Sequence, residues 1–336
     1  MKKPLAAFLP FLCTLLVIAA PALLIKAGVI DAYIAQIITA AGVNAILAIS
    51  VNLITGFCGQ LSLGQAGFMA IGAYTCISLN LDLGLPLPAA AIAASSVAAF
   101  ASFLIGFPSL KLTGDYLAIV TLGFGEIIRV ILTNLRPITG GANGRQFTTI
   151  IAVDPALAFL VVTLSLTAVI ILFQNFNRST YGRAILAVRE DEIAANSSGI
   201  GIFRYKMAAF ICAGFIAGLG GALYAMIIGF VKPDIASFTK SIDYLIFVVL
   251  GGMGSLTGSV IASYVLTAMQ EALRFLKDYR LLFYPLILIF VMLFRPQGLL
   301  GMKEFSFMAL ARRIFAVTAY IKKRIAASLL AKNRKN

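Results

Sequence analysis

Two charged residues stand apart because they occur well inside an apolar stretch. Glu126 lies eleven residues beyond Asp115, where the stretch begins, and Arg129 follows three residues later. A charge near the middle of a bilayer costs several kcal/mol if it faces lipid, so both side chains are expected to face protein or water. Positions i and i+3 share one helix face, so the two charges can neutralise each other. A structural ion pair and a direct contact with a solute are equally good interpretations.

A second region combines glycines with uncharged polar side chains. Between Gly56 and Tyr74, glycines occupy positions 56, 59, 64, 67 and 72. Each glycine costs a helix about 1 kcal/mol relative to alanine, so the segment must gain from close packing or from a bend. Small residues and interhelical hydrogen bonds are typical of a tight helix crossing, although the same polar groups could line a solute pathway. The candidates for these polar roles are Gln60, Ser62, Gln65, Thr121, Glu126 and Arg129.

Two further glycine clusters mark interruptions. They consist of Gly140, Gly141 and Gly144, and of Gly251, Gly252 and Gly254. The first lies in a connection that suits a gate, a docking surface or a plain turn. The second interrupts the long apolar stretch 242–270. Broken backbone at membrane depth is tolerated only where protein or a water-filled cavity satisfies its polar groups, so this stretch is expected to enter and return, or to cross twice as short helices.

The longest polar connection, 177–206, contains a pattern suited to docking. Its notable residues are Arg189, Glu192, Ala194, Ala195 and Gly199. Glu192, Ala195 or Asn196, and Gly199 fall on one helical face, where small side chains let another protein approach closely. A solvated helix that simply ends at Gly199 fits the pattern equally well.

Several kinds of chemistry are excluded by what the sequence lacks. The dipeptide Gly-Lys does not occur, so the usual phosphate-binding loop for ATP is absent. There is no histidine, and the four cysteines show no CxxC spacing, which excludes histidine-based triads and common zinc sites. The sequence therefore indicates no catalytic residue, no metal site and no cofactor, and an intramembrane enzyme is the weakest interpretation.

The elements that must position these residues are membrane helices. Hydrophobic residues make up 61% of the 336 residues and charged residues 12%, about half the roughly 25% of a soluble domain. Candidate crossings are 5–25, 33–54, 62–81, 86–107, 115–135, 155–176, 207–229, 242–270 and 281–294. The sequence thus predicts an all-α polytopic bundle of about eight to ten transmembrane helices with broken or re-entrant segments. It divides into a transmembrane domain over 1–300 and a basic tail over 301–336.

The distribution of positive charge predicts the orientation. Lys2 and Lys3 favour a cytoplasmic N-terminus, and six crossings from there return 177–206 to the cytoplasm. A return within 242–270 places the tail, with nine Lys or Arg after Gly301, on the same side. The net charge of +14 lies mostly at segment ends and in the tail, which indicates contact with the lipid bilayer rather than with nucleic acid.

Five motifs, in order, carry a resemblance to a known family. They are Gly59-Gln-Leu-Ser-Leu-Gly64, Gly114-Asp-Tyr-Leu-Ala-Ile-Val-Thr-Leu-Gly-Phe-Gly-Glu126, Thr139-Gly-Gly-Ala-Asn-Gly144, Leu250-Gly-Gly-Met-Gly-Ser255 and Arg295-Pro-Gln-Gly-Leu299. Together they resemble the LivM-type branched-chain amino acid permeases over roughly 40–300. The stretch Glu192 to Gly199 resembles the Glu-Ala-Ala loop of ATP-binding cassette importer permeases, with one extra residue before the alanines.

The resemblance implies a permease subunit of the bacterial inner membrane that imports branched-chain amino acids or a similar small polar solute such as urea. It also implies four kinds of partner: a second, LivH-type permease, two cytoplasmic ATPase subunits, a periplasmic substrate-binding protein and the bilayer. Residues 192–199 would contact an ATPase subunit. The alternative is a secondary transporter driven by an ion gradient, with Glu126 as its coupling group.

Overall fold

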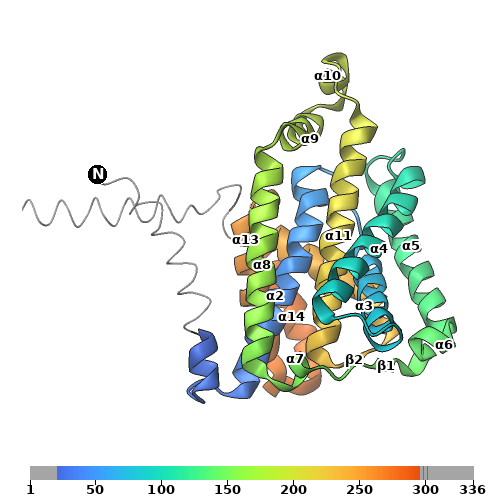
Figure 1. Cartoon of the computed structure of the whole chain (residues 1–336). Helices are drawn as coiled ribbons and strands as arrows, with labels where there is room; N and C mark the ends of the chain where they lie inside the picture. The colour runs from blue at the N-terminus through green and yellow to red at the C-terminus, as the bar shows by residue number, and fades with distance from the viewer. Residues whose placement is uncertain (1–20, 296–297, 299–300, 302–336) are drawn as a thin grey trace, which may run out of the picture. The chain divides into compact units, whose positions relative to one another are not determined.

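The computed structural model describes residues 21–295 together with Gly298 and Gly301. In this part of the chain, long helices pack side by side (Figure 1). Residues 5–20 of the first predicted crossing, Cys13 and the basic tail from residue 302 onward lie outside the described residues. The predicted boundary between a transmembrane domain and a tail therefore stays a prediction.

Most of the described residues belong to helices. The longer ones are α2 (Ala32–Asn52), α3 (Gln65–Leu81), α4 (Leu87–Ser109), α5 (Asp115–Asn134), α8 (Pro155–Arg178), α9 (Thr180–Glu190), α11 (Ile202–Ile228), α12 (Phe238–Gly251), α13 (Leu256–Ala272) and α14 (Arg280–Phe294). The shorter ones are α6 (Arg136–Thr139), α7 (Ile150–Val153), α10 (Glu192–Ser197), the π-helix η1 (Leu53–Phe57) and the 3-10 turns η2 (Gly141–Asn143), η3 (Pro233–Ala236) and η4 (Leu273–Tyr279). The strands β1 (Arg145–Gln146) and β2 (Phe230–Val231) form an antiparallel pair.

The core lies around α2 and α11. About 78% of the apolar stretch of the helix formed by α2 and η1 is buried and 61% of that of α11, against 28% for α5. Glycines permit the close packing: a Cβ atom on Gly72 would lie 2.2 Å from the Gly218 carbonyl oxygen, and one on Gly221 would lie 1.9 Å from that of Met69. Alanine at any of these contacts would push α3 and α11 apart, which explains the cost in helix propensity that the sequence accepts.

The predicted all-α polytopic bundle is confirmed. Among the described residues, five helices are long and apolar enough to cross a membrane, or six if the bent pair of α12 and α13 counts as one span. The total of about eight to ten stays a prediction, because it also relies on the shorter α3 and α14 and on residues outside the described part. One boundary differs, since α11 begins at Ile202 rather than near 207.

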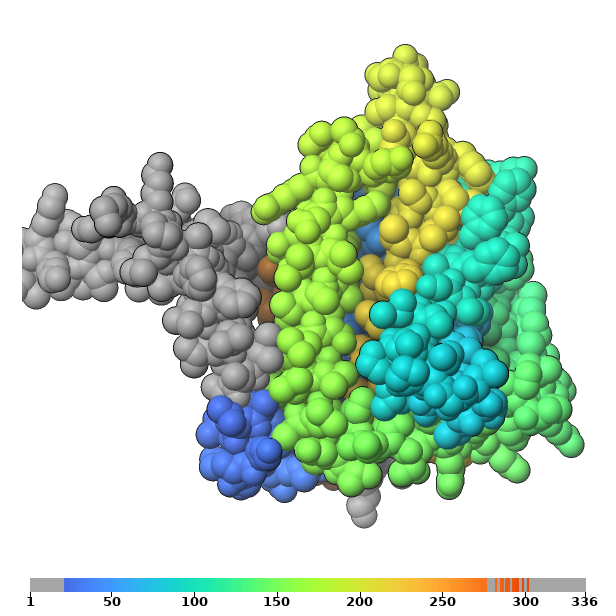
Figure 2. Space-filling model, viewed as in Figure 1, coloured from blue at the N-terminus to red at the C-terminus, as the bar shows by residue number. Residues whose placement is uncertain are grey.

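The two ends of the bundle carry different features. The helices α9 and α10 lie at one end, and the strand pair and α7 at the other (Figure 1). In the space-filling view α10 projects beyond the neighbouring helices (Figure 2). The bundle therefore has the protruding helix α10 at one end and the paired strands β1 and β2 at the opposite end.

Candidate functional site

The first interruption of a helix lies between α2 and α3. The end of α2 widens into the π-helix η1, and residues 58–64 then leave the helix before α3 starts. Single-turn π-helices occur frequently at functional sites. Here α5 packs against the unwound segment, since the Leu63 amide donates to Thr121 Oγ1 over 3.1 Å. Gly64 permits this approach, because a Cβ atom there would lie 2.8 Å from the Thr121 carbonyl oxygen.

Polar side chains of this segment are buried without partners. Gln60, Ser62 and Gln65 are each at most 7% exposed. Among the described residues, Gln60 Oε1, Ser62 Oγ and Gln65 Nε2 have no hydrogen-bond partner, whereas Gln65 Oε1 accepts from Ser50 Oγ over 3.0 Å. A buried polar group left unpaired costs about 1–3 kcal/mol. Three such atoms within six residues require explanation, and water or a solute is the ordinary way to satisfy them.

The second interruption joins α12 to α13. The two helices are bent by 120° at a break of a few residues. Gly251 faces Gly258 so closely that a Cβ atom on Gly251 would lie 2.5 Å from the Gly258 carbonyl. The predicted break at Gly251, Gly252 and Gly254 is therefore present, and the helix pair folds back on itself.

Asn52, near the end of α2, connects the two interruptions. Its Nδ2 donates to the Ser255 carbonyl over 2.9 Å and to Ser259 Oγ over 3.0 Å. Its Oδ1 accepts from the Gly254 amide over 2.9 Å. One amide side chain thus satisfies polar groups of the α12–α13 turn, which is what broken backbone within a membrane would need.

Arg189 links α9 to both interruptions. Its Nη1 donates to the Gly56 carbonyl over 2.9 Å. Gly59 has φ +70°, and a Cβ atom there would lie 2.7 Å from Arg189 Cγ. A Cβ atom on Gly254 would lie 3.3 Å from Arg189 Nη1. The guanidinium therefore lies where the α2–α3 and α12–α13 breaks meet, and two glycines provide the space for it.

The predicted docking helix is α10. Asp191 caps it by accepting from the Ile193 and Ala194 amides over 2.8 and 3.0 Å, and Gly199, with φ +81°, follows its end. Glu192 pairs with Lys206 of α11 over 2.6 Å, and Ala195 is buried. The face of Glu192 and Ala195 therefore turns toward the chain itself. Ile193 of α10 is 81% exposed.

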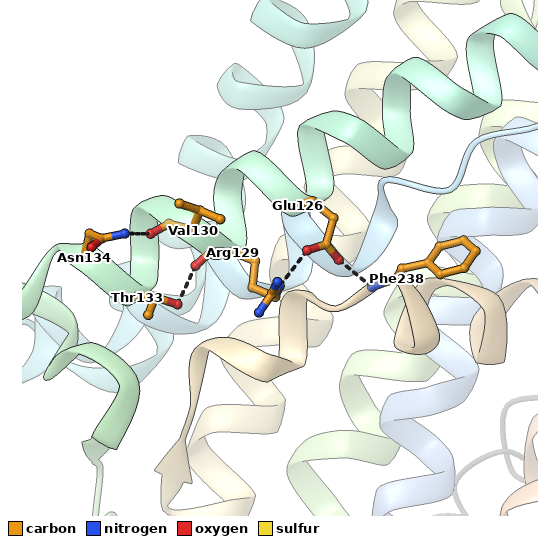
Figure 3. Close-up of polar contacts among 6 residues, drawn as sticks. All are labelled: Glu126, Arg129, Val130, Thr133, Asn134 and Phe238. Carbon is orange, nitrogen blue, oxygen red and sulfur yellow. Dashed lines mark hydrogen bonds and ion pairs between the residues drawn. The ribbon is translucent and has the colours of Figure 1, made fainter.

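Glu126 and Arg129 form the expected i, i+3 pair. Arg129 Nε donates to Glu126 Oε2 over 2.6 Å, and the Phe238 amide donates to Glu126 Oε1 over 3.1 Å (Figure 3). Phe238 is the first residue of α12, so the carboxylate also meets the positive end of that helix. Both side chains are about a third exposed, at 32% for Glu126 and 37% for Arg129. They face the start of α12 but are not enclosed by this chain alone.

The glycines at 140, 141 and 144 belong to a hydrogen-bonded turn. Thr139 Oγ1 donates to the Leu132 carbonyl over 2.6 Å and accepts from the Gly141 amide over 3.1 Å. Gly144 has φ +76°, and a Cβ atom there would lie 2.4 Å from the Val231 carbonyl oxygen of β2. The segment is thus an ordered turn beside the strand pair, and a gating or docking role stays a prediction.

An ion pair ties this turn to the end of α3. Arg145 Nη1 donates to Asp82 Oδ2 over 3.1 Å and to the Ile138 carbonyl over 2.8 Å. The hydrogen bond from Arg145 lowers the pKa of the Asp82 carboxyl below its usual value. The turn is therefore held most firmly while Asp82 is ionised.

Some contributing residues were missed from the sequence. Asn52 and Lys206 are buried polar residues within helices, and Lys206 is only 3% exposed. Asn52 is a polar residue near the end of a predicted crossing, and such a residue is a signal for a buried polar contact. Lys206 is charged, and its charge by itself predicts a position outside a buried helix. Within the described residues, no cluster of three His, Cys, Asp or Glu side chains suits a metal ion.

Comparisons with known proteins give consistent matches. The family model described as the permease component of branched-chain amino acid transport systems matches residues 33–292. The high-affinity branched-chain amino acid transport system permease proteins LivM of Salmonella typhimurium and of Escherichia coli are each 39% identical over 322 residues, covering 87% of this chain and 75% of theirs. The corresponding LivH protein of E. coli is 25% identical, covering 80% of this chain and 94% of its own length. No solved structure is significantly similar.

Proposed function

This chain belongs to the family of permease components of branched-chain amino acid transport systems, and we propose that it is the membrane-spanning subunit of an ATP-driven importer for branched-chain amino acids or a similar small polar solute. The observation that carries the proposal is the match to the family over residues 33–292, together with 39% identity to two LivM proteins. The family is a transport component, so the chain acts by moving a solute and not by transforming it.

The solute pathway passes the interruption between α2 and α3. Support comes from the unpaired atoms of Gln60, Ser62 and Gln65, which offer neutral donors and acceptors at membrane depth. Such groups can replace part of the hydration shell of a polar solute without adding a fixed charge that would hold it too tightly. Thr121 helps shape this site by holding the Leu63 amide.

The partners are a second, LivH-type permease, two cytoplasmic ATPase subunits and a periplasmic binding protein. Similarity to both LivM and LivH proteins supports pairing between two related permeases. The ATPase subunits meet α10, where Ile193 is an exposed apolar anchor beside Ala194. An aliphatic side chain exposed on a helical protrusion is suited to a pocket on another protein.

The α9–α10 end of the bundle faces the cytoplasm, and both termini lie on that side of the bacterial inner membrane. The positive-inside bias of 177–206 supports this orientation. Ser197, exposed at the end of α10, is a suitable reporter. The Ser197→Cys variant should resist an impermeant thiol reagent in intact cells and react after permeabilisation. Labelling in intact cells would overturn the orientation.

The source of energy is tested directly by uptake into proteoliposomes. The complete complex is reconstituted with its binding protein, and labelled leucine is supplied on the binding-protein side. Uptake should require ATP on the opposite side and continue when ionophores dissipate proton and sodium gradients. Uptake without ATP that stops on addition of an ionophore would favour the gradient-driven alternative. Glu126 would then be the coupling group, although Arg129 and the Phe238 amide already account for its charge.

A further inference from the structure

A cavity separate from the polar groups of residues 60–65 lies between four helices and a turn. Its volume is about 130 Å³. The residues that line it come from α2, α3, α11, η3 and α12, and they are Ala40, Val43, Asn44, Met69, Tyr224, Ile227, Ile228, Ile235, Lys240 and Tyr244. Since Ile228 ends α11 and Lys240 lies near the start of α12, the cavity lies toward the end of the bundle that carries β1 and β2 (Figure 1).

Half of the ten lining residues are aliphatic, and of these Val43, Ile227 and Ile235 are buried. A buried apolar cavity of about 150 Å³ is large enough to hold benzene, a molecule of six carbons. A cavity of about 130 Å³ therefore has room for a branched side chain of three or four carbons.

Four residues of the wall carry polar groups, and they are Asn44, Tyr224, Lys240 and Tyr244. Lys240 is half-exposed, and its Nζ lies 3.8 Å from Asp243 Oδ2, beyond hydrogen-bond distance. The two side chains form an ion pair, and at this distance the ammonium hydrogens can still bond another acceptor. Asn44 donates through Nδ2 to Thr267 over 3.0 Å, and the Tyr244 hydroxyl donates to the Met69 sulfur over 3.1 Å. The amide oxygen of Asn44 and the hydroxyl oxygen of Tyr244 are acceptors for a cationic group.

The cavity adjoins the proposed pathway. The Ala66 amide donates to Ser241 Oγ over 3.3 Å. Ala66 follows Gln65 on α3, and Ser241 follows Lys240 on α12. The cavity and Gln65, whose Nε2 has no partner among the described residues, therefore lie beside the same contact between α3 and α12.

We propose that this cavity is a binding site for an α-amino acid with a short branched aliphatic side chain. The Lys240 ammonium group binds the carboxylate, the aliphatic wall takes the side chain, and the oxygens of Asn44 and Tyr244 face the amino group. The assignment rests on the proposed importer function and adds to it the place where the solute is recognised within this chain. A mostly apolar lining with a few placed polar groups is the usual form of small-molecule sites.

The experiment uses the complete complex in proteoliposomes with leucine and alanine as probes. Lys240→Gln should raise the KM for leucine at least about tenfold, as expected for loss of a charge-assisted hydrogen bond. Lys240→Arg should stay within about threefold, because the positive charge is kept. Lys232→Gln is the matched control, since Lys232 is an exposed lysine that does not line the cavity.

A second variant tests the aliphatic wall independently of charge. Ala40→Leu adds three carbons to the lining of the cavity at a position that tolerates a good helix former. Leucine uptake should fall at least about fivefold relative to alanine uptake, because the smaller side chain needs less of the remaining space.

The outcomes separate the two proposals. The cavity site is overturned if Lys240→Gln and Ala40→Leu both take up leucine normally. It is also overturned if Lys240→Gln and Lys240→Arg lose leucine uptake equally. In both cases the importer function still stands. An Ala40→Leu variant that slows leucine and alanine alike would also overturn the cavity site. A wild-type complex that takes up neither probe with ATP would instead overturn the importer function on which the site rests.

Discussion

Replacing Arg189 by glutamine should uncouple ATP hydrolysis from solute movement. In the wild-type protein the guanidinium bonds the Gly56 carbonyl over 2.9 Å, and the side chain is only 20% exposed. A hydrogen bond to a charged group contributes about 1.5–3 kcal/mol. Its loss would reduce the population in which α9 is docked on the helix breaks by roughly 10- to 150-fold relative to the undocked state.

The assay compares ATP hydrolysed with leucine transported by the reconstituted complex. Arg189→Gln should retain basal ATPase activity and lose most uptake, so the ratio of ATP to solute rises. Arg189→Lys keeps a charge but lacks the planar fork, and should be intermediate. Arg183→Gln is the matched control, because Arg183 is exposed on the same helix and its Nη1 donates to the nearby Arg178 carbonyl, over 3.1 Å, rather than to a helix break.

Thiol accessibility gives a second readout that does not depend on partner chains. Cys58 is 3% exposed and packs with Ile185 of α9. With the other cysteines replaced by serine, a small maleimide should label Cys58 faster in Arg189→Gln than in Arg183→Gln. An Arg189→Gln protein with normal coupling and an equally protected Cys58 would refute the view that this side chain holds α9 on the breaks.

Three further predictions follow from individual contacts. Glu126→Gln should lower uptake, and adding Arg129→Gln should restore part of it; a double variant no better than the worse single one would contradict mutual neutralisation. Ile193→Asp should leave insertion unchanged but reduce ATPase retention during purification, and full retention would show that α10 docks nothing through this residue. Arg145 lowers the pKa of Asp82 in the folded protein below the ordinary carboxyl pKa of about 3.9. The ion pair should therefore persist at pH values above about 3.9 and weaken only as the pH falls through the lowered pKa of the folded state. Hydrogen exchange of β1, corrected for its intrinsic pH dependence, should therefore stay constant from about pH 7 to 5 and accelerate only below about pH 4; acceleration within the higher range would contradict it.

Helix placement was largely accessible from the sequence because it depends on the length of apolar runs. The predicted crossings 86–107 and 115–135 correspond to α4 and α5 within two residues at each end. The glycines at 251–254 correctly marked the α12–α13 break. The predicted start of α11 near residue 207 is wrong, because the helix begins at Ile202 and its first turns include the charged residues Arg204 and Lys206. Lys206 is tolerated in the buried helix because Glu192 neutralises it.

The contacts of the candidate site were less accessible, because they join segments far apart in sequence. The pattern of α10 predicts a docking face that includes Ala195; within this chain Ala195 is buried and Ile193 is exposed, and the contact of residues 192–199 with another protein stays a prediction. Helical periodicity defines a face without saying which neighbour covers it. The same limit applies to Asn52 and Arg189, whose partners lie about 200 and 130 residues away.

The joint position of Asn52 and Arg189 has a mechanical consequence. Asn52 Oδ1 accepts a hydrogen bond from the Gly254 amide. Arg189 Nη1 donates to the Gly56 carbonyl and also lies beside Gly254. A displacement of α9 would therefore act on both helix breaks together, and the α2–α3 break carries the unpaired polar groups of Gln60 and Ser62. Interruptions have fewer helical hydrogen bonds to lose than continuous helices, so they deform at lower cost when pushed. A motion that begins at α10 would thus reach both helix breaks through the contacts of Arg189 and Asn52.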